Sequence, residues 1–489
     1  MKRTLIYTML LIMAVLASAA CTKTATDNQE KEEELPETFG PNFFGCNFMS
    51  SYYLWNKEIE DKLETWTTGM DPISTVRKLR YKDNSGDDID KWTIMTDKFS
   101  TFNKSVEGTS TTFGWSLAFY AVSSTSDEVL AIVCYTSKDS PAAKAGLKRG
   151  DCIVAVDSTP ITKENFSKIA NNKLYGSKKI GITLNTARTV EITPVTMYEE
   201  PILLTTVFEE GGRKAGYMVF NSFTLDACPG LAQAGREFRD AGVKDLILDL
   251  RYNSGGFVLT EELLASILAP KDAVDAGKVF QKEIYNSNLG ENETKFTWKH
   301  TVNSKSIDTR ESNIGIEKLY AIVTNNSASA SESILTGLIP YMDVELVGSR
   351  TYGKFCGGIL KSCASWYEDF KDPIKKVNPE FYTTGKAQSA DWGMYLMVSR
   401  YADVNGNTPS MPSGMEADIA SDDKPYEVYQ LGDPRENMLR TALEAAGYHI
   451  AGTSDMGMTK SGFRNTEPTE LEYHSPEFGI FVTNRQFLR

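Results

Sequence analysis

The sequence predicts a multidomain α/β protein, and two observations carry this prediction. The chain has 489 residues, of which 41% are hydrophobic. A chain of this size and apolar content can bury more than one core and should divide into two or three domains. Between residues 216 and 268, a strand pattern, an amphipathic helix pattern, a second buried strand, a glycine turn and another helix follow one another. This alternation predicts a layered α/β core.

The first twenty residues have the composition of a cleaved export signal. A basic start precedes an apolar run that is short for a bilayer span, and small residues lead to Cys21. A membrane anchor helix is the alternative. Residues 18–21 resemble a bacterial lipobox, with Ser18 in place of the usual leucine. The resemblance implies that Cys21 is lipidated and that the polar, acidic residues 21–41 tether the protein to a cell-envelope membrane, on its periplasmic or cell-surface side.

The net charge and the cysteine and histidine content limit the classes of partner, metal and cofactor that we expect. The formal net charge of −13 argues against nucleic acid or anionic lipid as the main partner. The six cysteines after Cys21 contain no CxxC pair, and the chain has only three histidines. We therefore expect no metal and no cofactor. An exported compartment permits a disulfide, but the sequence leaves its pairing open, as it does the oligomeric state.

Residues 42–105 predict a small helical domain. The segment opens with closely spaced aromatic and aliphatic residues, among them Tyr52, Tyr53 and Trp55. Two later stretches begin with acidic residues or Asp-Pro, which favour helix starts. We expect the aromatic side chains to form a core rather than a ligand platform.

Residues 112–197 resemble a PDZ domain. The resemblance rests on SPAAKAGLKRGDCIVAVD, in which Pro141 can open a short helix, and on the loop FGWSL. PDZ domains bind extended peptide ends by adding them as a strand to a sheet edge. The resemblance implies that the backbone of Gly114, Trp115, Ser116 and Leu117 binds a terminal carboxylate. Alternatively, the PDZ fold only packs against its neighbour.

Residues 201–450 predict the α/β core, and the turn motif DLRYNSGG lies within it. Two polar segments, 282–315 and 362–391, are expected to be irregular insertions on the rim of this core. Residues 451–489 form a polar and aromatic tail without a clear period, for which the sequence suggests no function.

Serines cluster where a strand should meet a helix. The apolar run Leu319–Val323 is followed by NNSASASESI, which predicts a helix start with exposed N–H groups and a positive dipole end. Ser329 and Glu332 also have the spacing of a capping box. If Glu332 only caps the helix, its replacement by alanine should cost about 1 kcal/mol or less. The next buried strand leads into a loop that contains Lys354.

NSASASESI, GSRTYGK and DLRYNSGG together resemble the carboxyl-terminal processing peptidases, also called tail-specific proteases. The resemblance implies a crotonase-like peptidase core in which Ser329 is the nucleophile and Lys354 is the base. It further implies an oxyanion hole formed by the N–H of Ala330 with that of Gly255 or Gly256. The scarcity of histidine and the lack of a GxSxG motif agree with a base other than histidine.

One position departs from the family pattern. Many members carry a glutamine four residues after the lysine, where it helps orient the lysine side chain, but this chain has Gly358. We expect another group, such as Ser349, Tyr352 or a residue of an inserted loop, to orient Lys354. The missing glutamine also leaves room for a weak enzyme.

The sequence thus predicts an exported serine endopeptidase that cleaves polypeptides, recognised through their C-terminal ends, by a Ser-Lys acyl-enzyme mechanism. One alternative is a catalytically weak or inactive relative that acts as a PDZ peptide-binding lipoprotein. Another is an esterase on the same fold. Ser421 and Lys424 also have Ser-x-x-Lys spacing, but their polar, Asp-rich surroundings disfavour catalysis there.

Overall fold

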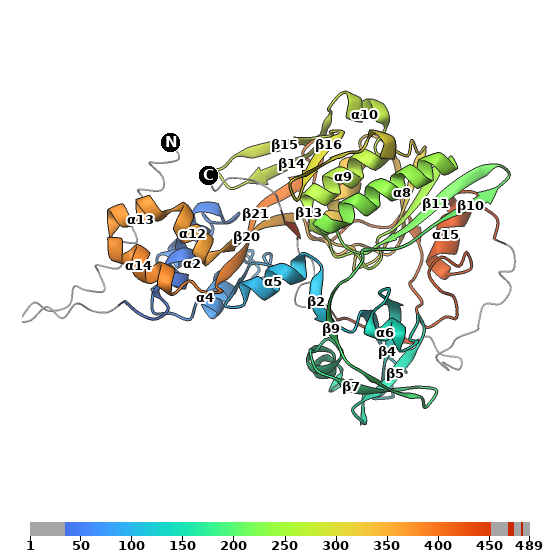
Figure 1. Cartoon of the computed structure of the whole chain (residues 1–489), viewed down its shortest axis with the longest axis horizontal. Helices are drawn as coiled ribbons and strands as arrows, with labels where there is room; N and C mark the ends of the chain where they lie inside the picture. Colours follow the sequence, from blue (N-terminus) through green and yellow to red (C-terminus); the bar gives the residue numbers. More distant parts are fainter. Residues whose placement is uncertain (1–34, 451–467, 474–480, 483–489) are drawn as a thin grey trace, which may run out of the picture.

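The computed structural model describes residues 35–450, 468–473 and 481–482. They form an α/β core, a smaller β-rich domain below it and a helical layer at one end (Figure 1). This arrangement confirms the multidomain α/β prediction. The predicted export signal, Cys21 and most of the predicted tether lie outside the described residues. Among the helices that the structure describes, none is long and apolar enough to cross a membrane.

The first sheet of the core carries the segments on which the site depends. It has six strands in the order β10-β11-β12-β18-β19-β22, antiparallel between β10 and β11 and parallel from β11 onward. Because parallel strands end at one edge, the turns after β12 and β18 meet there. The strands are β10 (Ile202–Glu210), β11 (Arg213–Phe220), β12 (Asp245–Asp249), β18 (Lys318–Val323), β19 (Asp343–Gly348) and β22 (Ile419–Ala420).

Helices cover both faces of this sheet. One face packs on α8 (Cys228–Ala241), α9 (Val258–Leu268) and α11 (Ala330–Leu338), whose apolar side chains share a core with alternate strand residues. The other face packs on α15 (Asn437–Ala445). A parallel sheet that is covered on both sides explains why its strands are continuous apolar runs in the sequence.

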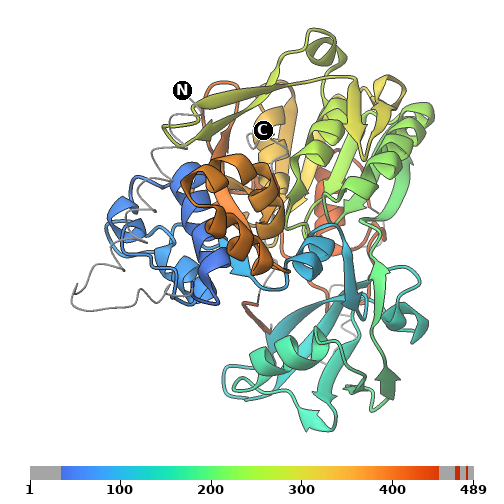
Figure 2. The ribbon, with the colours of Figure 1, turned by 60° about the vertical axis from the view of Figure 1, so that its left-hand side comes forward.

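A second sheet lies beside the first (Figure 2). Its order is β13-β24-β20-β21-β14-β15, and β1 (Ile94–Thr96) pairs with β21. Residues 282–315, expected to be irregular, are largely ordered as strands, so this expectation was wrong. The strands are β13 (Gly256–Phe257), β14 (Val279–Tyr285), β15 (Glu291–Lys295), β20 (Cys356–Ser362), β21 (Gly393–Ala402) and β24 (Phe481–Val482), with a separate hairpin of β16 (Lys299–Val302) and β17 (Lys305–Asp308).

The helical layer combines two distant parts of the chain. The predicted N-terminal helices α2 (Phe39–Tyr52), α3 (Glu60–Leu63), α4 (Pro72–Leu79) and α5 (Phe99–Val106) are present. The segment 362–391 adds α12 (Cys363–Asp369), α13 (Lys371–Val377) and α14 (Pro379–Ala387), where irregular structure was expected. This segment is ordered because Trp366, Tyr367 and Phe381 are buried in the same hydrophobic cluster as the aromatic residues of α2.

The contact between α2 and α14 is close. A Cβ added at Gly40 would lie 2.6 Å from the carbonyl oxygen of Gly385, so glycine is needed for this approach. The rings of Phe39 and Phe381 lie 5.1 Å apart across the same contact. Helix α2 already begins at Phe39, which is inside the range predicted as tether.

The smaller domain is built from residues 109–198 together with a strand from the C-terminal tail. As expected, α6 (Pro141–Lys144) begins at Pro141, and the side chain of Ser140 caps it by accepting from the N–H of Ala143 at 3.1 Å. The sheet order is β23-β3-β4-β5-β7-β8, so a strand from the C-terminal tail is at its edge. The elements are β2 (Thr109–Thr112), β3 (Trp115–Ala121), β4 (Val129–Thr136), β5 (Cys152–Val156), β6 (Thr159–Pro160), α7 (Phe166–Ile169), β7 (Ile180–Leu184), β8 (Thr189–Ile192), β9 (Val195–Tyr198) and β23 (Thr469–Leu471).

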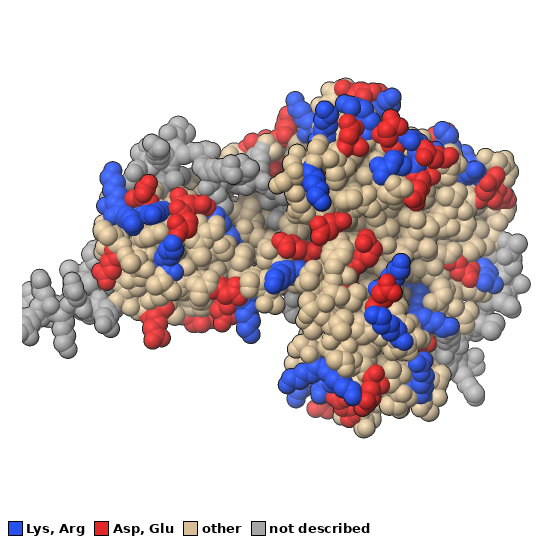
Figure 3. Space-filling view, viewed as in Figure 1, with Lys and Arg blue, Asp and Glu red and all other residues tan. Residues whose placement is uncertain are grey.

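Charged side chains of both signs are interspersed on the face shown in Figure 3. No large area of a single sign gathers there. The six cysteines after Cys21 are buried thiols. Among the described residues, no group of three or more His, Cys, Asp or Glu side chains is placed to hold a metal ion.

Candidate active site

Ser329 lies on the turn between β18 and α11, as the sequence predicts. Its backbone is at φ +62° and ψ −112°, an unfavourable conformation for a residue with a side chain. The side chain is fully buried, and its hydroxyl has no hydrogen-bond partner among the described residues. A strained backbone and an uncommitted buried hydroxyl both cost free energy, and such costs concentrate at functional sites.

Glu332 joins the serine turn to the lysine loop. Its carboxylate accepts the N–H of Ser329 at 2.9 Å, the N–H of Lys354 at 2.9 Å and that of Gly353 at 2.7 Å. It also accepts the hydroxyl of Thr351 at 2.6 Å. The first of these bonds belongs to the predicted capping box, but the other three of the four donors come from the lysine loop. Burial raises the pKa of Glu332 to about 7.

Lys354 is fully buried in an aromatic enclosure. Its Nζ donates to the hydroxyl of Tyr395 at 3.1 Å and lies 5.2 Å from the ring centroid of Trp92. Burial disfavours the charged ammonium and lowers the pKa of Lys354 to about 8, although the charges of Asp90 and Glu332 act against this shift. The neutral amine is therefore more populated near neutral pH than in an exposed lysine.

Tyr395 occupies the space next to Gly358, the position where many family members have glutamine. A Cβ added at Gly358 would lie 2.6 Å from Cε2 of Tyr395 and 2.4 Å from Cε of Met397. There is no room for a glutamine side chain at this position while Tyr395 is present. One group that contacts Lys354 Nζ is thus on β21, and it was not among the candidates expected from the sequence.

The DLRYNSGG turn is bonded directly to the serine turn. The carbonyl oxygen of Asn253 accepts the N–H of Ala328 at 3.1 Å and the hydroxyl of Ser331 at 2.8 Å. Ala330 is the first residue of α11, where a backbone N–H has no acceptor within the helix. The predicted donors are thus on adjoining turns. However, the N–H of Gly255 donates to Oδ1 of Asn253 at 2.9 Å, whereas Gly256 has entered β13.

A buried charge network fastens the smaller domain to this turn. Arg149 of the smaller domain donates to the hydroxyl of Tyr252 at 2.6 Å and to Asp423 at 2.5 Å. Arg251 donates to Glu436 at 2.7 Å and also reaches Asp423, at 3.1 Å. Although burial acts against ionisation, the charges of Arg149 and Arg251 lower the pKa of Asp423 to about 2. Paired buried charges of this kind fix the turn in one position.

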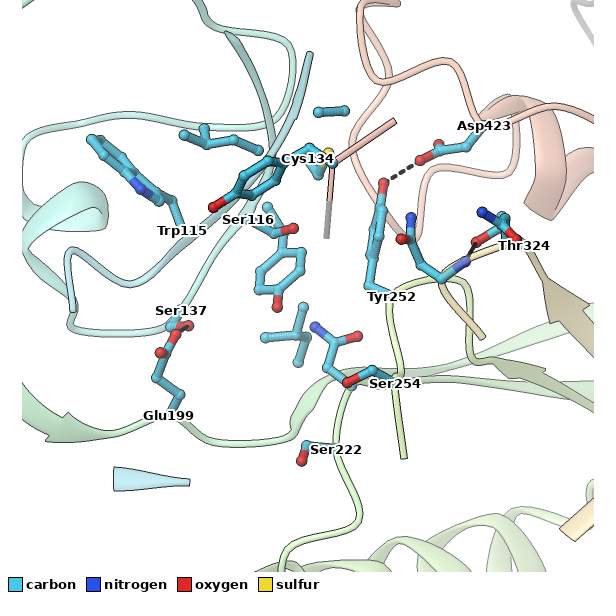
Figure 4. A pocket seen from close by; sticks show the side chains of 18 of the residues that line it. Trp115, Ser116, Cys134, Ser137, Glu199, Ser222, Tyr252, Ser254, Thr324 and Asp423 are labelled. Atoms are coloured by element: carbon cyan, nitrogen blue, oxygen red, sulfur yellow. Dashed lines mark hydrogen bonds between the residues drawn. The ribbon is translucent and has the colours of Figure 1, made fainter. Parts of the chain in front are cut away.

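A cavity of about 770 Å³ separates the smaller domain from the core. Trp115 and Ser116 line it on one side, and Tyr252, Ser254 and Thr324 line it on the other (Figure 4). Ser329 and Lys354 are not among its lining residues, and both are fully buried. Gly255 and Gly256 of the DLRYNSGG turn are among its lining residues.

The predicted carboxylate loop is already hydrogen-bonded in part. The N–H of Gly114 donates to Oγ1 of Thr112 at 2.9 Å, and the N–H of Leu117 donates to the hydroxyl of Tyr175 at 3.1 Å. The indole of Trp115 is buried in the core of the smaller domain. A carboxylate would have to replace these hydroxyl acceptors.

Ser421, the alternative nucleophile, does not share the positive φ and the unbonded hydroxyl of Ser329. The Ser421 hydroxyl lies 3.1 Å from Oγ1 of Thr441 and accepts from Nδ2 of Asn437 at 3.4 Å. Its hydroxyl is therefore engaged, and the strained turn is at Ser329.

Two family models match the chain. Residues 132–171 match the model described as PDZ domain, and residues 214–421 match the model described as Peptidase family S41. Residues 214–421 form a peptidase core of family S41, and the protein is a serine-type peptidase. These matches confirm the resemblance to tail-specific proteases and the predictions of a PDZ domain and a peptidase core.

Relatives of this S41 peptidase agree with the assignment. A protein named probable CtpA-like serine protease from Staphylococcus aureus (strain bovine RF122 / ET3-1) is 24% identical over 424 residues, which are 83% of this chain and 77% of the relative. A protein of the same name from Staphylococcus saprophyticus is 25% identical over 323 residues, covering 64% of this chain and 57% of that protein. The crystal structure of a putative S41 protease from Bacteroides fragilis shares the fold, with a TM-score of 0.61 and 18% identity over 87% of this chain and 99% of that one.

Replacing Glu332 by alanine should lower the free energy of unfolding by about 3 kcal/mol or more, because three buried N–H donors would each lose a partner at roughly 1–3 kcal/mol. Urea unfolding followed by tryptophan fluorescence measures the loss. The matched control is Glu444→Ala, which removes an exposed carboxylate from α15 and should have little effect. A loss of 1 kcal/mol or less for Glu332→Ala would support the simple helix cap instead.

Proposed function

We propose that this S41 peptidase is an endopeptidase in which Ser329 is the nucleophile and Lys354 the general base. The observation that supports this most is the shared carboxylate, because the amides of both residues donate to the same oxygen, Oε2 of Glu332. This holds an uncommitted hydroxyl and an amine of lowered pKa on adjoining loops. Activation of serine by a neutral amine needs these two properties together.

In the proposed reaction, neutral Nζ of Lys354 takes the proton from Oγ of Ser329, and Oγ attacks the scissile carbonyl carbon. The resulting oxyanion accepts the N–H of Ala330 and one from the glycine pair Gly255–Gly256. Each such donor is typically worth about 3 kcal/mol in the transition state. Collapse breaks the C–N bond, and the protonated lysine gives its proton to the leaving amine. Water, deprotonated by the same lysine, then hydrolyses the acyl-enzyme.

We further propose that the substrates are polypeptides engaged by the PDZ domain at the loop Gly114–Leu117, C-terminal end first, and that the enzyme acts outside the cytoplasm on a lipid anchor at Cys21. The cavity between the PDZ domain and the core supports the first part, since a peptide bound at β3 would lie on the route to the oxyanion turn. The composition of residues 1–41 supports the second part.

Ser329→Ala and Lys354→Met should each abolish cleavage of unfolded β-casein, and the double variant should be no worse, because the two residues act as a unit. Ser329→Ala should leave stability unchanged, since no group loses a partner. In the wild type, kcat/KM should rise with pH through about 8 and level off above it, because the neutral lysine is the reactive form. Cleavage that persists in Ser329→Ala would exclude this nucleophile, and a wild type that cleaves nothing would favour the peptide-binding alternative.

Tyr395→Phe should lower kcat about 10- to 100-fold with little change in KM, because the ring stays while Lys354 loses a contact that positions its amine. Since that contact favours the charged lysine, the midpoint of the pH profile should also move to lower pH. Tyr448→Phe is the control. Tyr448 is buried in the cluster between the first sheet and α15, and this cluster does not contain Lys354. An unshifted pH profile with full activity would show that Tyr395 does not position the base.

Cys21→Ser should move the protein from the membrane fraction to the soluble fraction, because a serine at this position cannot carry the thioether-linked lipid. Fractionation and immunoblotting measure the change, and mass spectrometry of the mature N-terminus identifies the lipid. A wild type that is soluble, with an unmodified cleaved terminus, would show that no lipid anchor exists.

A further inference from the structure

The C-terminal tail supplies the edge strand of the PDZ sheet. Strand β23 pairs antiparallel with β3, so that Thr469 lies opposite Ala121 and Leu471 lies opposite Phe119. Peptide ligands of PDZ domains are added to a sheet edge as an extended strand in this manner. Because the pairing is antiparallel, the tail runs in its carboxyl direction toward the loop Gly114–Leu117.

Side chains of the tail fill the adjoining groove. The ring of Tyr473 stacks on Tyr175 with centroids 5.6 Å apart and planes at 11°, and it meets Phe119 edge-on at 5.3 Å. Its hydroxyl donates to Oδ1 of Asn171 at 3.0 Å. Leu471 packs against the same core. Tyr175 also binds the N–H of Leu117, so Tyr473 is stacked on the residue that occupies one amide of the predicted carboxylate loop.

The same tail reaches the peptidase core. Strand β24 pairs parallel with β13, with Phe481 opposite Gly256, and Val482 also lies opposite Gly358 of β20. Strand β13 follows the oxyanion turn, and β20 follows the loop of Lys354. The tail therefore lies between the two elements that carry the proposed oxyanion donors and the proposed base.

Residues 468 and 470–473 are also part of the wall of the cavity between the PDZ domain and the core. An incoming peptide would need the same strand edge and the same space. The nucleophile and base are fully buried in this state, in agreement with a closed site.

We infer that the tail is an internal ligand that competes with substrate, and that the groove along β3 takes an extended peptide segment of the pattern Leu-x-Tyr. The inference rests on the proposed role of the PDZ domain in binding substrate. The segment in the groove is internal, because the chain continues to Arg489. At this register the groove recognises backbone and two side chains, and a terminal carboxylate is not needed. A tethered segment acts at an effective concentration on the order of millimolar, so a free peptide of equal intrinsic affinity displaces it only at a comparable concentration.

The test measures binding in the full chain with Ser329→Ala present, so that no peptide is cleaved. The probe is the fluorescein-labelled, amidated peptide PTELEY, which reproduces residues 468–473, and anisotropy gives its Kd. Leu471→Ser/Tyr473→Ala, which removes the two groove contacts of the tail, should bind the probe at least tenfold more tightly than the parent. Thr469→Ser, an exposed position on the same strand, should bind it as the parent does.

A second measurement separates this inference from the proposed chemistry. With Ser329 intact, Leu471→Ser/Tyr473→Ala should cleave β-casein several-fold faster than the wild type. Tighter probe binding without cleavage by any variant would support the internal ligand and contradict the Ser-Lys mechanism. Equal probe binding by parent and variant would overturn the inference, and so would weaker binding by the variant, which would make the tail a structural part of the groove.

Discussion

The site depends on one buried carboxylate. Glu332 accepts donors from the start of α11 and from the loop after β19, and it adds to the backbone hydrogen bond from Tyr352 N–H to the carbonyl oxygen of Ser327 that also joins these segments. The arrangement is costly, because the carboxyl group is buried without a cation beside it in a salt bridge, and its pKa is raised accordingly. Four donors offset that cost. Strain at Ser329 can persist because the N–H of that residue is held on the same oxygen.

Lys354, the proposed base, is enclosed by residues from parts of the chain that are far apart. Trp92 comes from the N-terminal segment and Tyr395 from the strand that follows the helical insertion, and each belongs to the cluster that α2, α12 and α14 share with β21. The helical layer therefore contributes more than an outer support to the core. It helps to exclude water from Lys354, and burial is the main cause of the lowered pKa of this lysine.

The sequence predicted the features that local pattern encodes. The strand-to-helix turn at Ser329, the helix start at Pro141 and the order of core elements follow from apolar runs, turn residues and caps. It did not predict Tyr395 or Trp92 as neighbours of Lys354, since nothing local links these residues across such separations. The helices of 362–391 were missed because their buried aromatics are spaced among polar residues, and burial there depends on α2. Glu332 was assigned to its own helix, although most of its donors come from a loop twenty residues later.

The tail strand has a further consequence for the PDZ sheet. Strand β3 would be the outermost strand of that sheet without β23, and its backbone groups on that side would lack partners. The edge proposed to receive peptides is also the edge by which two copies of the domain could pair. A protein that lost its tail through proteolysis would expose a long strand with apolar residues on both sides of it. In the structure, the tail covers this strand edge as well as the groove.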